Sequence, residues 1–131
     1  MSAQTQATLV LVIEDEPLIA DLLQTELEDA GFAVVVVSDG VEALARLAEQ
    51  RCFAGVVTDI NLGGPHDGWE IGRQARQQNA SAAVVYCTGL DAHEWVSKGV
   101  PRSAILTKPF PPAEVVVALA AMMNSPAAET D

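Results

Sequence analysis

Five short, almost continuous apolar runs constrain the fold of this chain more than any other feature. They cover residues 8–13, 32–37, 53–58, 82–87 and 103–107, and valine is common in most of them. A run that is apolar throughout, without alternation between apolar and polar residues, is typical of a strand covered on both faces. These runs therefore predict one buried parallel sheet with helices on both sides.

A helical pattern follows each apolar run. Pro17 stands where a helix favours its first residue, and Gly31 is expected to close that helix. Asp39 with Glu42 three residues later indicates a capping box at the start of the second helix. Gly99 and the proline after it limit the fourth helix to a short one. The expected helices span residues 17–30, 40–48, 69–78, 91–98 and 111–123.

Five strands that alternate with five helices predict an α/β three-layer sandwich around a five-stranded parallel sheet. Because crossover connections are right-handed, few arrangements remain, and the flavodoxin-like order 2-1-3-4-5 suits five strands. In that order the chain adds strands on one side of the first strand and then on the other, so the strand order reverses between the first and third strands. Ligands bind outside the carboxyl ends of the strands at such a point, so we expect the functional site there.

Size and charge limit the function classes. A chain of 131 residues fits one domain, which we expect to span residues 8–123 between disordered ends at 1–7 and 124–131. The net charge of −11 repels nucleic acids and anionic membranes, so neither is an expected partner. Without an expected signal peptide or membrane span, the protein is predicted to be soluble and cytoplasmic. Cys52 and Cys87 are interpreted as structural thiols, since they match no metal or disulfide spacing.

Polar residues stand where four of the apolar runs end. Glu14 and Asp15 follow the first run, Asp59 the third, Thr88 the fourth and Lys108 the fifth. If the strands are parallel, these side chains converge on one edge of the sheet. Carboxylates crowded in this way favour a bound cation, and Mg²⁺ is commonly held by one or two carboxylates and a phosphate oxygen. The alternatives are acidic residues that complement a helix N-terminus and a solvated surface lysine.

The motifs IEDEP, TDINL, DGWE, CTG and TKPF resemble, in order and spacing, the receiver domain of two-component response regulators. The resemblance covers residues 8–123. It implies that Asp59 is the phosphoacceptor, that Thr88 is the switch hydroxyl and that Lys108 contacts the phosphoryl group. It further implies a Mg²⁺ site whose ligands are Glu14, Asp15, Asp59 and the backbone carbonyl of Asn61. The Lys108–Pro109 bond, in a tight turn, is a candidate for a cis peptide.

The resemblance implies a single-domain response regulator in a phosphorelay. The phosphoryl group is expected to come from a sensor histidine kinase or a histidine phosphotransfer protein, and phosphorylation is expected to switch binding to a downstream protein. A role as a relay intermediate that passes the phosphoryl group on is an open alternative, as is an interaction domain that has kept only the fold. A Mg²⁺-dependent phosphohydrolase needs a second catalytic acid near the nucleophile. Asp67, across a glycine-rich loop, is poorly positioned for that role, so a signalling domain is expected instead of a turnover enzyme.

Three departures from the family pattern stand out. The acidic pair is Glu–Asp instead of two aspartates, and the loop after Asp59 is one residue longer. Ile105 occupies a position where many receivers carry a switch aromatic. Tyr86, two residues before Thr88, is the candidate substitute, and an aromatic-x-Thr-Gly stretch is similar to that of some stand-alone alphaproteobacterial receivers. The alternative is that Tyr86 only fills the core. Trp95 is interpreted either as a partner anchor or as a packed side chain.

Overall fold

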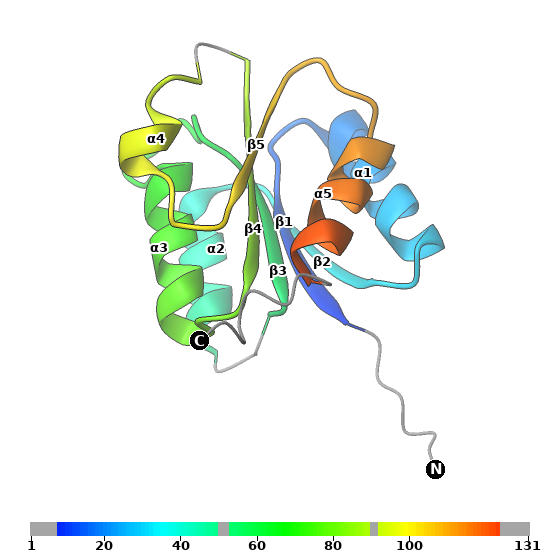
Figure 1. Cartoon of the computed structure of the whole chain (residues 1–131), viewed down its shortest axis with the longest axis horizontal. Coiled ribbons are helices and arrows are strands. Elements are labelled where there is room, and N and C mark those ends of the chain that lie inside the picture. Colours follow the sequence, from blue (N-terminus) through cyan, green and yellow to red (C-terminus); the bar gives the residue numbers. More distant parts are fainter. Residues whose placement is uncertain (1–7, 50–52, 90–91, 124–131) are drawn as a thin grey trace.

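The apolar runs form one central sheet. The structure is a computed structural model, and it describes residues 8–49, 53–89 and 92–123. The expected disordered ends and Cys52 lie outside these residues. Helices and strands alternate along the chain (Figure 1): β1 Leu9–Ile13, α1 Pro17–Asp29, β2 Ala33–Val37, α2 Gly40–Ala48, β3 Gly55–Asp59, α3 Gly68–Gln78, β4 Ala83–Thr88, α4 Trp95–Lys98, β5 Ala104–Thr107 and α5 Ala113–Met123.

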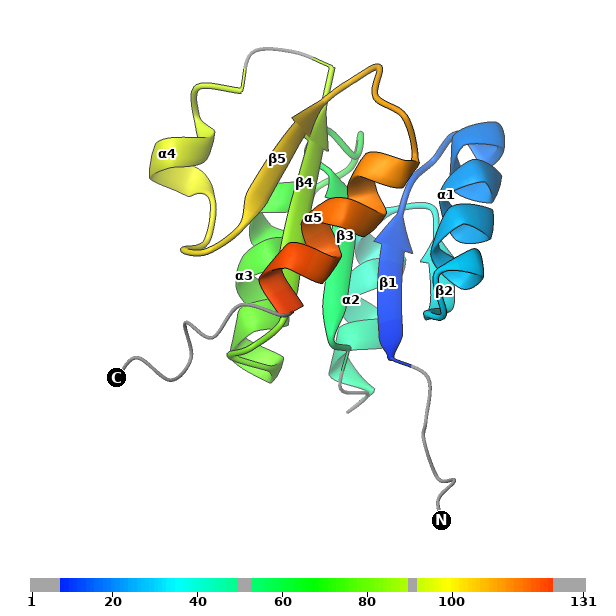
Figure 2. The ribbon, with the colours of Figure 1, turned by 45° about the vertical axis from the view of Figure 1, so that its right-hand side comes forward.

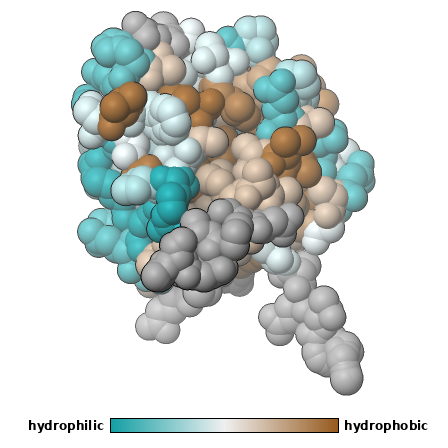
Figure 3. All heavy atoms as spheres, in the orientation of Figure 1, coloured by the Kyte–Doolittle hydropathy of each residue, from teal (hydrophilic) through white to brown (hydrophobic). Residues whose placement is uncertain are grey.

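The sheet is parallel throughout, in the order β2-β1-β3-β4-β5. The predicted α/β fold and strand order are therefore confirmed. All residues of β3 and β4 are buried, which explains why these runs carry no polar alternation. β5 lies at an edge and stays partly exposed. Figure 3 shows apolar side chains gathered toward the middle of the face on which β5 and α5 lie, with polar side chains around them.

Helices cover both faces of the sheet. Figure 2 shows α5 in front of the sheet and α1 beside it, whereas α2, α3 and α4 lie on the other face. Leu23, Leu27 and Leu119 pack in the first layer with inward valines of the strands. In the second layer the core is built around Trp69 and Tyr86, together with apolar residues of α2. Among the described helices, none has the length and apolar content needed to cross a bilayer.

Three of the predicted helices agree with the structure to within one residue at each end: α1 ends at Asp29 instead of residue 30, α2 matches, and α3 begins at Gly68 instead of residue 69. Pro17 begins α1, and Gly31 follows its end with a φ of +100°, a conformation that favours glycine. The side chain of Asp39 caps α2 by accepting a hydrogen bond of 2.8 Å from the amide of Glu42. The prediction that α5 begins at residue 111 is wrong, since it begins at Ala113. A residue that precedes a proline avoids helical geometry, and Pro112 follows residue 111 directly.

The fourth helix ends at Lys98, before Gly99, as predicted, but it is a single turn that begins at Trp95 instead of residue 91. Trp95, its first residue, is half-buried and packs against the core. Its indole Nε1 donates a hydrogen bond of 2.9 Å to the Ser103 hydroxyl. A Cβ at Gly99 would lie 2.3 Å from the indole ring, so the ring fills the space that glycine leaves. The structure therefore supports the interpretation of Trp95 as a packed side chain.

Candidate functional site

The carboxyl ends of the strands meet at the upper edge of the sheet in Figure 1. Glu14 follows β1, Asp59 and Thr88 are the last residues of β3 and β4, and Lys108 follows β5. Backbone hydrogen bonds join these ends: the amide of Ile60 donates to the Cys87 carbonyl (3.0 Å), and the amide of Lys108 donates to the Thr88 carbonyl (2.7 Å). The predicted convergence of these residues is thus present.

Three carboxylates form the centre of the site. One oxygen each from Glu14, Asp15 and Asp59 lies within 4.8 Å of the other two. Glu14 and Asp59 are buried, at 4% and 9% exposure, whereas Asp15 is exposed. Burial, followed by the charge of Asp59, raises the pKa of Glu14. Burial also raises the pKa of Asp59, against the opposing effect of Lys108. The cluster is therefore held together at an electrostatic cost that a cation would relieve.

Lys108 supplies the opposing charge. Its Nζ lies 3.2 Å from Glu14 Oε1 and 3.0 Å from Asp59 Oδ1. Burial lowers the pKa of this ammonium, but the hydrogen bonds and charges of Asp59 and Glu14 outweigh burial and raise it overall. One ammonium cannot balance three carboxylates. An all-oxygen donor set with a residual negative charge suits a hard ion such as Mg²⁺, so Glu14, Asp15 and Asp59 fit that role.

The start of α3 lies against the end of β3. Gly68 begins this helix, and its amide donates to the Ile60 carbonyl at 2.8 Å. A Cβ at Gly68 would lie 2.2 Å from the Asp59 carbonyl oxygen, so only glycine allows the helix to start this close to the strand. Asp67 caps α3, since its Oδ1 accepts a hydrogen bond of 2.9 Å from Glu70 N. The Asp67 side chain is therefore already used in the structure of the helix.

Thr88 and Tyr86 lie on β4 with their side chains on the same face of the sheet. Thr88 is buried, at 3% exposure. Tyr86 is fully buried, and its ring centroid is 4.8 Å from that of Trp69. The Tyr86 hydroxyl accepts a hydrogen bond of 3.1 Å from the amide of Val100, in the turn between α4 and β5. Ile105, on the neighbouring strand, packs against the same core cluster.

The remaining residues singled out in the sequence lie around the site. Asn61 is exposed in the loop after β3. The Lys108–Pro109 peptide is cis, as predicted. His66 Nδ1 lies 2.8 Å from Glu70 Oε1, so this imidazole pairs with a residue of α3. His93 is exposed before α4, and Cys87 is buried beside the site, where burial raises the pKa of its thiol to about 12. That shift keeps the thiol protonated and unreactive.

One structural residue escaped the sequence analysis. The guanidinium of Arg76, on α3, donates hydrogen bonds to the carbonyls of Ala82 (2.7 Å), Pro101 (2.5 Å) and Arg102 (2.9 Å). It thus ties α3 to the start of β4 and to the turn before β5. The partners are backbone oxygens, which every residue carries, so no motif could have indicated them.

Comparisons with known proteins agree with this geometry. The family model described as the response regulator receiver domain matches residues 10–120. A response regulator receiver protein from Sinorhizobium medicae WSM419 is 39% identical, with a TM-score of 0.88, over 92% of this chain and 97% of that one. The chemotaxis response regulator CheY4 of Vibrio cholerae is 27% identical, with a TM-score of 0.76, over 89% of this chain and 99% of its own.

Among curated proteins, the alkaline phosphatase synthesis transcriptional regulatory protein PhoP of Bacillus subtilis (strain 168) is 36% identical over 118 residues. The match covers 88% of this chain but only 48% of PhoP. The chain thus spans about half the length of the curated relatives it matches.

Proposed function

Because the chain belongs to the response regulator receiver domain family, we propose that Asp59 accepts a phosphoryl group and that its phosphorylation switches the binding of a partner protein. Receiver domains take phosphoryl groups from histidine kinases and act on downstream effectors, and they are signalling domains, not turnover enzymes. The observation that carries the proposal is the arrangement around Asp59: two further carboxylates within 4.8 Å and the Lys108 ammonium at 3.0 Å.

The proposed reaction is an in-line displacement at phosphorus. A carboxylate oxygen of Asp59 attacks, and the bond between phosphorus and the imidazole nitrogen of the donor histidine breaks with its electron pair going to that nitrogen. In the structure the Lys108 ammonium donates hydrogen bonds to both Glu14 and Asp59. It is therefore placed to pair with a phosphoryl oxygen in the product. Bound Mg²⁺ would neutralise charge on the transferring oxygens. Glu14, Asp15, Asp59 and the carbonyl of Asn61 are its proposed ligands.

The proposed switch begins at Thr88. Its hydroxyl is expected to contact the new phosphoryl group, and this contact favours one conformation of the α4–β5 region. Tyr86 is the proposed second part of the switch, because it lies two residues earlier on the same strand face and bonds to Val100 beyond α4. In a Tyr86→Leu variant, normal phosphorylation with a lost partner response would support this role. A normal partner response would indicate that Tyr86 only fills the core.

The acceptor is tested by mass. The protein is incubated with acetyl phosphate and Mg²⁺, and the intact mass is measured for three forms: unmodified, Asp59→Asn and Asp67→Asn. Asp67 is a matched control, since it is also an aspartate near the start of α3 but caps that helix. We expect one added phosphoryl group in the unmodified and Asp67→Asn forms, a loss of labelling with EDTA, and none in Asp59→Asn. Equal labelling of Asp59→Asn would refute the assignment.

The partner is sought in two steps. A phosphorylated histidine kinase or phosphotransfer protein is expected to label Asp59 faster than acetyl phosphate, because a docked donor holds the phosphorus in line. Transfer back to a phosphotransfer protein would favour the relay role over the partner switch. That this receiver works without an attached effector stays a prediction. The phosphohydrolase alternative loses support because the carboxylate it would need, on Asp67, is used as a helix cap.

A further inference from the structure

A cavity lies at the amino ends of the strands, at the opposite end of the sheet from the acidic cluster. It is a cavity of about 460 Å³, formed where β3, β4 and β5 begin and where α3 and α5 end. This volume falls within the range of small-molecule sites, about 300–1,000 Å³. The acidic cluster lies at the other end of the sheet, where β1 and β3 end. The cavity therefore shares no lining residue with the proposed phosphorylation site.

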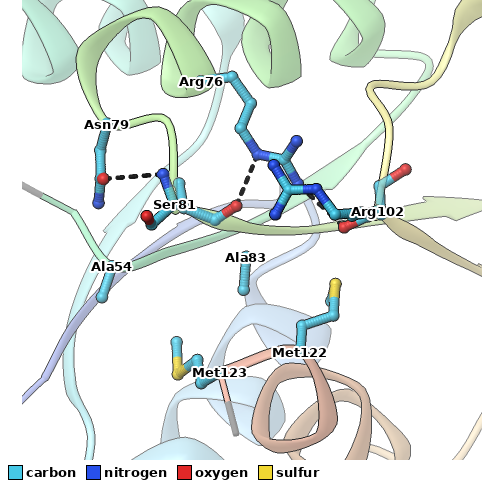
Figure 4. A pocket seen from close by; sticks show the side chains of 10 residues that line it. Ala54, Arg76, Asn79, Ser81, Ala83, Arg102, Met122 and Met123 are labelled. Carbon is cyan, nitrogen blue, oxygen red and sulfur yellow. Dashed lines mark hydrogen bonds between the residues drawn. The ribbon is translucent and has the colours of Figure 1, made fainter. Parts of the chain in front are cut away.

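One wall of the cavity carries two positive charges. Figure 4 shows the side chains of Arg76 and Arg102 together on one side of the pocket. Arg76 donates three hydrogen bonds, all to neutral carbonyls. A guanidinium has five N–H groups, so two of them have no partner among the described residues. Within the described residues, neither arginine forms an ion pair with a carboxylate. Arg76 is half-buried and Arg102 is exposed, so the two guanidinium groups form a local positive patch in a chain with a net charge of −11.

The two arginines affect each other. Burial and the neighbouring charge of Arg102 lower the pKa of Arg76, which reports the cost of holding both cations here. Two other polar side chains of the cavity, those of Asn79 and Ser103, form hydrogen bonds within the protein. The Asn79 amide bonds to the Phe53 carbonyl and to the Ser81 amide, and the Ser103 hydroxyl donates to the Val100 carbonyl. The free donors are thus mainly those of the arginines, which favours an anionic ligand group.

The facing wall is apolar. Figure 4 shows Met122 and Met123, at the end of α5, across the pocket from the arginines, with Ala83 between the two groups and Ala54 to one side. Methionine side chains are flexible and adapt to apolar ligands of different shape. A bare inorganic anion would leave this wall unused. A ligand that uses both walls has a compact anion at one end and a short hydrocarbon part at the other.

We propose that this cavity binds a small amphipathic carboxylate, whose carboxylate group pairs with Arg76 and Arg102 and whose hydrocarbon part packs on Met122 and Met123. Planar guanidinium groups match carboxylates in a two-point arrangement, which a lysine would not provide. The ligand would also contact the turn that Arg76 binds before β5. This inference does not depend on phosphorylation of Asp59, and the two can fail separately.

The test is a titration followed by ¹H–¹⁵N NMR on the assigned, unphosphorylated protein. Hexanoate is the probe, and acetate and 1-hexanol supply each half of it alone. We expect saturable shifts with hexanoate at the amides of Ala82, Ser103 and Met123, and binding weaker by about tenfold or more for either half probe. Equal binding of acetate would indicate a simple anion surface, and equal binding of 1-hexanol a simple apolar pocket; each result would overturn the proposal, as would a lack of saturable shifts.

Variants give an independent check. Arg102→Gln is expected to weaken hexanoate binding about tenfold or more, because it removes a charged donor. Arg73→Gln is the matched control, since Arg73 is exposed on α3 and does not line the cavity. Met122→Ala, on the facing wall, is expected to weaken hexanoate but not acetate. If Arg102→Gln and Met122→Ala bind hexanoate as tightly as Arg73→Gln does, the proposal is wrong.

Discussion

The buried hydroxyl of Tyr86 offers the sharpest test of the packing described above. The substitution Tyr86→Phe removes one oxygen and keeps the ring. In the structure that oxygen accepts the hydrogen bond of the Val100 amide, and Val100 itself is buried at 9% exposure. The variant therefore leaves a backbone N–H without a partner in a site closed to water. Such an unsatisfied donor costs about 1–3 kcal/mol.

This cost is measurable by thermal or urea unfolding. For a domain of this size, 1 kcal/mol corresponds to roughly 3–5 °C in the unfolding midpoint, so we expect a decrease of several degrees. The van der Waals contact of the ring with Trp69 is kept, so the loss reports the hydroxyl alone. A Tyr86→Phe variant within about 0.3 kcal/mol of the original protein would refute the reasoning, because it would mean that Val100 finds another partner at no cost.

A neighbouring glycine provides a cross-check. A Cβ at Gly72, in the middle of α3, would lie 2.2 Å from the Tyr86 hydroxyl and 2.8 Å from Cζ. Alanine is favoured over glycine in a helix by about 1 kcal/mol, but overpacking at this distance costs about 1–3 kcal/mol, so Gly72→Ala is expected to destabilise the protein. In the Tyr86→Phe background the oxygen is gone, and the same substitution should cost less. Additive effects of the two substitutions would show that the contact is unimportant.

Three further predictions concern the edge of the sheet and its helices. Gly68→Ala forces a Cβ against the Asp59 carbonyl, so it is expected to cost about 1–3 kcal/mol in urea unfolding and to slow labelling by acetyl phosphate; unchanged labelling would contradict the proposed closeness. Asp39→Ala removes the cap of α2 and should cost about 1 kcal/mol, whereas Asp39→Ser, which can still cap, should retain most of the stability. The raised pKa values of Glu14 and Asp59 mean that the folded protein keeps these protons to a higher pH than the unfolded chain does. Their contribution to the free energy of unfolding should therefore fall as the pH rises from their ordinary values of 4.5 and 3.8 through the raised ones, and the fall should be smaller in Glu14→Gln and with added Mg²⁺; urea unfolding across this pH range measures it.

The parts of this molecule that the sequence predicts are those in which a residue type has one structural use. A short, almost continuous apolar run indicates a buried strand. Parallel strands place their carboxyl ends together, so the meeting of Glu14, Asp59 and Lys108 followed from topology. Pro17, Gly31 and Asp39 mark helix ends for similar local reasons. The start of α5 was missed because Pro112 keeps the residue before it out of the helix, and the apolar pattern that follows gives no sign of this effect.

Other contacts left no trace in the sequence. Arg76 reaches carbonyls 6, 25 and 26 residues away, and Tyr86 binds an amide 14 residues away. Because backbone groups are the same at every position, only the folded arrangement selects these partners. The need for glycine at position 68 is of the same kind, since it depends on how closely α3 approaches the end of β3.

The three hydrogen bonds of Arg76 have a mechanical consequence. They join the carbonyl just before β4 to the two carbonyls just before β5, so a single side chain fastens both ends of the stretch that contains β4 and α4. A displacement that starts at Thr88 would have to be absorbed between these two anchors. The single turn of α4 would then move relative to two points that Arg76 ties to α3.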